Sequence, residues 1–142
     1  MPEAPIPSVV AMLVCDQVIS EQGTGKKSLI GIFENISAPA FPTQTRLAIY
    51  AKLVDASGYY HILIRLVNLK DESKVAEIKA ELKIIDPTAC AELALNIAGI
   101  ILPAAGKYEF QLYANDAFLH RVTMNAVLLQ GGLQWQPPKS RQ

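Results

Sequence analysis

The sequence predicts an all-β fold, a two-sheet antiparallel β-sandwich of about eight strands. Three observations support this prediction: apolar residues recur at every second position or in runs of about ten, turn-forming residues separate these runs, and one segment alternates strictly between apolar and charged residues. Eight antiparallel strands cannot cover both faces as one flat sheet. Two sheets must therefore pack about 10 Å apart, or one sheet must close into a barrel, and we favour the sandwich.

The eight expected strands follow one another with short connections. The first two, 9–19 and 29–36, are apolar on both faces, which predicts central or covered positions. The third and fourth, 46–53 and 60–67, alternate between apolar residues and a mixed second face. The strictly alternating segment is the fifth strand, and three more strands follow it: 93–101, 108–114 and 118–128. In the last of these, the residues expected to face the core are Phe118, Val122, Met124, Ala126 and Leu128.

The strictly alternating segment is the fifth strand. One side carries Ala76, Ile78, Ala80, Leu82 and Ile84, and the other carries Glu77, Lys79, Glu81 and Lys83. A helix would scatter these charges around its axis, whereas a strand places them all on one face. The segment therefore predicts a strand with one buried and one solvated face.

Length and composition fit one folded domain. The chain has 142 residues, of which 51% are hydrophobic and 18% charged, and this composition excludes disorder. We expect an N-terminal extension at 1–8, the sandwich domain at 9–129 and a C-terminal tail at 130–142, because the tail lacks alternation.

Charge and hydropathy exclude several partners. Thirteen basic residues balance thirteen acidic ones, so nucleic acid is not an expected partner. No apolar run approaches the roughly 18 residues of a transmembrane segment. The first residues lack the positive start of a secretory signal, so we expect a cytoplasmic protein with two reduced, buried thiols, Cys15 and Cys90.

The glycine-rich turn 23–28 partly matches a phosphate-binding loop. The full G-x-x-x-x-G-K-[ST] pattern requires glycine at the position of Ser20 and serine or threonine at that of Lys27. Both positions differ, and the turn joins two expected strands. We therefore predict a flexible hairpin and no phosphate site.

Four stretches of the sequence stand out as a set. They are Val14-Cys15-Asp16 ahead of the glycine-rich turn, Ser28-Leu29-Ile30-Gly31-Ile32-Phe33, Phe41-Pro42 and Pro103-Ala104-Ala105-Gly106-Lys107-Tyr108-Glu109-Phe110. Together they resemble a family of small bacterial β-sandwich proteins of unknown function, from Val9 to Leu129. The resemblance implies a bacterial origin and an immunoglobulin-like or C2-like sandwich. It implies no activity, and no catalytic or binding residue is carried over from it.

The sequence shows neither a set of catalytic residues nor a set of metal ligands at suitable spacing. His61 should stand on the outer face of its strand and His120 on the inward side, while Cys15 and Asp16 should point to opposite sides of a strand. The cysteines and histidines lack zinc spacing, and the loop aspartates that could bind calcium occur singly: Asp55, Asp71, Asp86 and Asp116. We expect no enzyme, no cofactor and no metal.

Apolar residues on faces that should be polar provide the functional hypothesis. They are Ala48, Tyr50, Val54, Leu63 and Val67. If their two strands pair, they form an apolar patch, which either binds a partner or is covered by a loop or by the tail that contains Trp135. The first reading predicts a non-enzymatic interaction or self-assembly module that binds a protein partner or a second copy through a sheet face or edge. The alternative is a C2-like domain that binds calcium, lipid or a small ligand.

Overall fold

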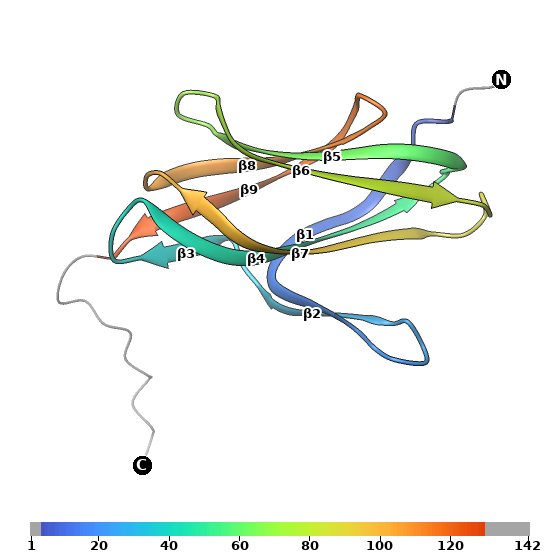
Figure 1. Cartoon of the computed structure of the whole chain (residues 1–142), viewed down its shortest axis with the longest axis horizontal. Coiled ribbons are helices and arrows are strands. Elements are labelled where there is room, and N and C mark those ends of the chain that lie inside the picture. Colours follow the sequence, from blue (N-terminus) through green and yellow to red (C-terminus); the bar gives the residue numbers. More distant parts are fainter. Residues whose placement is uncertain (1–3, 130–142) are drawn as a thin grey trace, which may run out of the picture.

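Two β-sheets stack face to face over residues 4–129, the part of the chain that the computed structural model describes (Figure 1). The expected tail at 130–142, with Trp135, lies outside the described residues. The strands are β1 (Ser8–Ser20), β2 (Lys27–Ile32), β3 (Asn35–Ala38), β4 (Thr43–Val54), β5 (Gly58–Asn68), β6 (Ser73–Ile84), β7 (Ala91–Leu102), β8 (Gly106–Ala114) and β9 (Ala117–Leu128).

Sheet A has the order β2-β1-β4-β7, and sheet B has the order β3-β9-β8-β5-β6. The predicted all-β sandwich is confirmed, with two corrections. The expected strand 29–36 is two strands, because the chain leaves sheet A after Ile32 and enters sheet B at Asn35. There β3 lies parallel to β9, so the sandwich is not wholly antiparallel.

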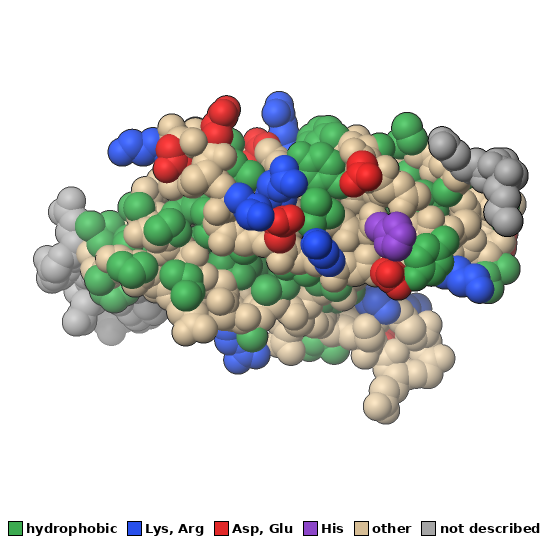
Figure 2. Space-filling view, turned by 45° about the horizontal axis from the view of Figure 1, so that its top comes forward, with side chains coloured by type: hydrophobic (Ala, Val, Ile, Leu, Met, Phe, Trp, Pro, Cys, Tyr) green, Lys and Arg blue, Asp and Glu red, His purple; other side chains and the backbone are tan. Residues whose placement is uncertain are grey.

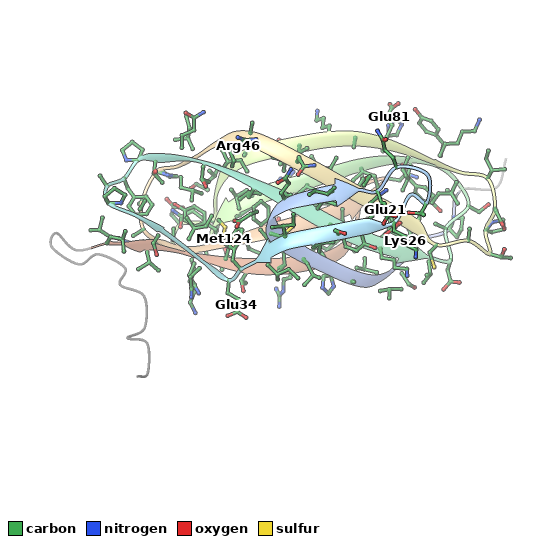
Figure 3. All side chains as sticks on the ribbon, turned by 90° about the horizontal axis from the view of Figure 1, so that it is seen from below. Glu21, Lys26, Glu34, Arg46, Glu81 and Met124 are labelled. Carbon is green, nitrogen blue, oxygen red and sulfur yellow. The ribbon has the colours of Figure 1, made fainter. Side chains whose placement is uncertain are left out.

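The core lies between the sheets and draws on both. Its fully buried large side chains are Leu47, Ile49, Leu53, Tyr60, Ile62, Ile64, Leu66, Leu102, Tyr108, Phe110, Leu112 and Met124. Figure 3 labels Met124, which β9 contributes to this core. The alternation of β4, β5 and β8 sends every second residue into this layer, as the sequence predicts.

The alternation of β9 is broken at its start. Leu112 pairs with His120 and Tyr113 with Phe118, so Leu119 is an extra residue between the two pairs. Because this bulge shifts the faces, Phe118 is 53% exposed and Leu119 packs on the core. The predictions that Phe118 and Leu128 are core residues are wrong, since both are exposed. His120 lies opposite the buried Leu112, so it is on the inward side as predicted, but it is exposed near the start of β9.

A hairpin made by the distal half of β1 and by β2 leaves the plane of sheet A and lies over its outer face (Figure 1). The pairing of β1 with β4 ends at Cys15, while its pairing with β2 continues to Ser20. The turn is closed by the Glu21 N–H, which donates to the Lys26 carbonyl at 2.8 Å, and Figure 3 shows both residues at its tip. The glycine-rich hairpin is confirmed, whereas β2 is an edge strand and not a central one.

Asn96 of β7 connects this hairpin to the rest of sheet A. Its side-chain carbonyl accepts the Val18 N–H at 3.0 Å, and its amide donates to the Val18 carbonyl at 3.1 Å. The side chain reaches past the small Ala48, with which Asn96 pairs in the sheet. It thus supplies the two hydrogen bonds that a neighbouring strand would give to Val18.

Substituting Asn96 by alanine is expected to lower the free energy of unfolding by about 1–2 kcal/mol, because both bonds are lost. Hydrogen exchange of the Val18 amide should accelerate most. The control is Asn96→Asp, which keeps the acceptor and loses the donor, and its effect should be smaller. Unchanged exchange at Val18 in the alanine variant would contradict this role.

Candidate functional site

The five residues of the predicted patch lie in two different sheets. Ala48, Tyr50 and Val54 belong to β4 in sheet A, and Leu63 and Val67 belong to β5 in sheet B. The condition that the two strands pair is not met, because the chain crosses from one sheet to the other in the turn between them. The structure therefore does not bring the five residues together.

Two of the three sheet A residues, Ala48 and Tyr50, are covered by the β1–β2 hairpin, whereas Val54 is half-buried at the end of β4. Ala48 and Tyr50 form a small cluster with Cys15 and Val18, and all four are buried. Leu29 and Ala94 pack against this cluster. This cover is a hairpin of two strands and not the loop that the sequence suggested, and the tail with Trp135 lies outside the described residues.

Tyr50 is also tied to its own sheet. Its hydroxyl donates a hydrogen bond to the carboxylate of Glu92 on β7. Burial, followed by this bond and the nearby negative charge, raises the pKa of Tyr50 to about 12. Tyr50 is therefore neutral at physiological pH, and its hydroxyl links β4 to β7 instead of being available to a partner.

The sheet B residues lie on the outer face of that sheet, where Figure 2 shows charged and apolar side chains intermixed. Leu63 borders a hollow of about 470 Å³ between β5 and β6, near His61 and Lys79. Val67 borders a second hollow of about 620 Å³ that is more polar. Its other lining residues are Arg65, Leu69, Glu72, Lys74, Glu109, Gln111 and Arg121.

Arg65 stands between the two hollows. Its guanidinium carbon lies 5.5 Å from the centre of the Tyr113 ring, a cation–π contact. Its Nε is buried and has no hydrogen-bond partner. Because a buried N–H usually finds an acceptor, Arg65 retains an unused donor on this face.

A chain of hydrogen bonds runs along β8 beside Arg65. The Tyr113 hydroxyl donates to Gln111 Oε1 at 3.1 Å, and Gln111 Nε2 donates to Glu109 Oε1 at 2.9 Å. Glu109 is only 8% exposed, and within residues 4–129 it forms no ion pair. A buried carboxylate and a guanidinium with a free donor thus share one face.

Tyr113 also contacts Phe118 of β9 edge to face, with ring centres 5.7 Å apart. The bulge that moves Phe118 out of the core places it beside Tyr113. We name the resulting surface the Arg65 face. It consists of Leu63, Arg65, Glu109, Gln111, Tyr113 and Phe118.

Sequence reasoning found Leu63 and missed the other members. Arg65, Glu109, Gln111 and Tyr113 do alternate with core residues, so their outward direction was readable. What was not readable is that β8 lies beside β5, which brings Arg65 next to Gln111 and Tyr113. A pairing between strands so distant in sequence leaves no local signal.

The residues considered for catalysis lie apart. Cys15 is on β1 in sheet A, while both histidines are in sheet B. Burial raises the pKa of the Cys15 thiol, which disfavours the reactive thiolate. His61 Nδ1 lies 3.6 Å from Glu81 Oε1 on the exposed face. Cys90, expected to be buried, is exposed, and both cysteines are free thiols.

The aspartates considered as calcium ligands lie in turns, and two of them accept hydrogen bonds from residues of the same turn. Asp86 accepts the Thr88 N–H and hydroxyl, and Asp71 accepts the same groups of Ser73; these bonds lower the pKa of both carboxyls. Asp55 and Asp116 occupy turn positions with positive φ. Across the described range, no three His, Cys, Asp or Glu side chains cluster as metal ligands would.

These observations define a β-sandwich domain with a mixed polar and aromatic face on its second sheet. No helix between residues 4 and 129 is long and apolar enough to cross a membrane. The chain belongs to DUF6941, a family of unknown function whose model matches residues 10–127.

Two solved structures are similar to the chain. One is an immunoglobulin-like protein from Pseudomonas aeruginosa, with 10% identity over 88% of this chain and 97% of that protein, and a TM-score of 0.45. The other is a β-glucosidase from Listeria innocua in complex with isofagomine, with 7% identity over 87% of this chain and 17% of the enzyme, and a TM-score of 0.42. No curated protein matches the chain in sequence.

Proposed function

We propose that this protein is a non-enzymatic interaction module that binds a protein partner through the Arg65 face. The single observation that carries the proposal is Arg65 itself, stacked on Tyr113 with a buried, unused Nε donor. Arginine and tyrosine, together with tryptophan, are the residue types most enriched among the side chains that dominate binding energy.

The layout of the face supports this function. Half-buried Leu63 and exposed Phe118 supply apolar area beside the Arg65–Tyr113 pair. The outward residues of β6, among them Glu77, Lys79 and Glu81, form a charged margin on one side. An apolar and aromatic centre with a polar margin is the usual anatomy of a protein interface.

The hollow beside Val67 indicates what the partner presents. Arg65, Lys74 and Arg121 line it together with Glu72 and Glu109, so basic groups are in slight excess. A carboxylate of the partner entering this hollow would accept hydrogen bonds from a guanidinium, which are about twice as strong as neutral ones. The proposed partner therefore carries an acidic side chain next to an apolar one.

Photo-crosslinking in the native cells tests the proposal. A benzophenone amino acid at Phe118 is expected to give a covalent adduct with one defined protein, detected by immunoblot and mass spectrometry. The control position is Ile101, an exposed apolar residue of β7 in sheet A. The substitution Leu63→Asp should reduce the adduct at least tenfold without altering the circular dichroism spectrum.

Equal labelling from both positions would refute the proposal, because it would show contact without preference for the Arg65 face. An adduct that persists unchanged in the Leu63→Asp variant would refute it as well.

A further inference from the structure

The free edge of β6 is self-complementary. β6 is the last strand of sheet B and pairs with β5 alone, so its other edge has no strand beside it in the described chain. Its pairing with β5 is regular from Ala76 to Ile84, after the irregularity next to Val67. Figure 3 shows Glu81 projecting from this edge of the molecule.

From this pattern we propose that β6 pairs with β6 of a second copy, antiparallel and centred on Ala80. Directly opposite residues of an antiparallel pair share one face of the sheet. In a pair centred on Ala80, Glu77 therefore lies opposite Lys83 of the second copy, and Lys79 opposite its Glu81. Every outward charge of the regular stretch then meets the opposite charge.

Neighbouring registers lack this match. A pair centred on Lys79 sets that residue against itself and Glu77 against Glu81 of the second copy. A pair centred on Glu81 likewise opposes like charges. Centres on Ile78 or Leu82 retain only part of the complementary contacts. A register centred between two neighbouring residues is excluded, because it would place outward residues of one copy opposite inward residues of the other. Ala80 is also the midpoint of the regular stretch.

The inward side of the strand supports the same pairing. Ala76, Ile78, Ala80 and Leu82 pack on the core and remain half-buried, whereas inward residues of the central strand β5 are buried. In the proposed pair, Ile78 lies opposite Leu82 of the second copy. A neighbouring strand would therefore cover apolar side chains that the edge position leaves partly open.

Two lysines on the outward side are available for these contacts. In the described part of the chain, Lys79 and Lys83 form no ion pair. Glu77 is already bound by Lys74 at 2.6 Å, and Glu81 accepts a hydrogen bond from Tyr59. The bond from Lys74 lowers the pKa of Glu77, so that carboxylate stays charged at neutral pH.

Charge reversal tests the pairing. Sedimentation equilibrium of the wild type should show a monomer–dimer equilibrium in the micromolar range. The single substitutions Lys79→Glu and Glu81→Lys should each raise the dissociation constant at least tenfold, because each sets like charges opposite each other at both symmetric contacts. The double variant, with both reversals, should return the constant to within threefold of the wild type. Lys107→Glu, a change at an exposed residue of β8, is the control and should have no effect.

Disulfide trapping tests the register separately. In a Cys90→Ser background, Ala80→Cys should form a covalent dimer on mild oxidation, since position 80 faces itself. Ala76→Cys should not, since position 76 faces Ile84 of the second copy. A wild type that stays monomeric at millimolar concentration would overturn the inference, and the alternating charges would then only protect the edge. Dimers that ignore the single reversals, or that trap equally at positions 76 and 80, would overturn it too. None of these results bears on the Arg65 face, whose partner is tested by crosslinking.

Discussion

Replacing Phe110 by alanine is expected to lower the free energy of unfolding by about 3–5 kcal/mol. Phe110 is 0% exposed and lies in β8, which is flanked by β5 and β9 in the middle of sheet B. Its partners across the two neighbouring strands are Leu66 and Val122, so the lost ring leaves a cavity that the sheet cannot close. Urea unfolding followed by circular dichroism measures the change.

Phe118→Ala is the matched control, because it removes the same ring from an exposed position of the neighbouring strand. Its expected cost is below about 1 kcal/mol, mainly the lost edge-to-face contact with Tyr113. Similar losses in both variants would contradict the placement of the β9 bulge.

These two phenylalanines mark how far the sequence predicts the fold. Phe110 follows the strict alternation of its strand, so its burial was predictable from local pattern alone. Phe118 also fits an alternating pattern, yet one extra residue at Leu119 reverses its direction. A bulge depends on how two strands meet, and the alternation of one strand does not contain that information.

The candidate site was predictable to a smaller extent. The apolar character of Leu63 on an outward position was visible in the sequence and led to the outer face of its strand. The grouping of Leu63 with Tyr50 failed, because consecutive strands usually pair, and here the chain changes sheets between β4 and β5. The burial of Tyr50 depends on a hairpin that closes over it, which is again a contact between distant segments.

The two proposed surfaces share sheet B and leave each other accessible. β6 is the edge strand, whereas most of the Arg65 face lies on β5, β8 and β9. In a pair of copies joined through β6, the outer faces of both sheets B lie on the same side, because antiparallel pairing preserves the faces. A dimer would therefore present two Arg65 faces together, and a partner with two matching sites would gain affinity from both.

Raising the pH is expected to destabilise the wild type more than a Tyr50→Phe variant, by about 2 kcal/mol between pH 9 and pH 11.5. The pKa of Tyr50 is raised from 10.0 to about 12 in the folded chain, so the unfolded chain loses this proton first. Above pH 10 the unfolded state binds fewer protons than the folded state, and the free energy of unfolding falls as pH rises. The contribution is fully present below pH 10 and is lost as the pH passes 12.

Urea unfolding of both proteins at the two pH values measures this difference. All other ionisable side chains are the same in both chains, so the comparison isolates the contribution of Tyr50. The variant also loses the hydrogen bond to Glu92, but that loss is already present at pH 9 and leaves the pH-dependent part unchanged. A stability difference that stays constant across this interval would show that Tyr50 is not shielded beneath the β1–β2 hairpin.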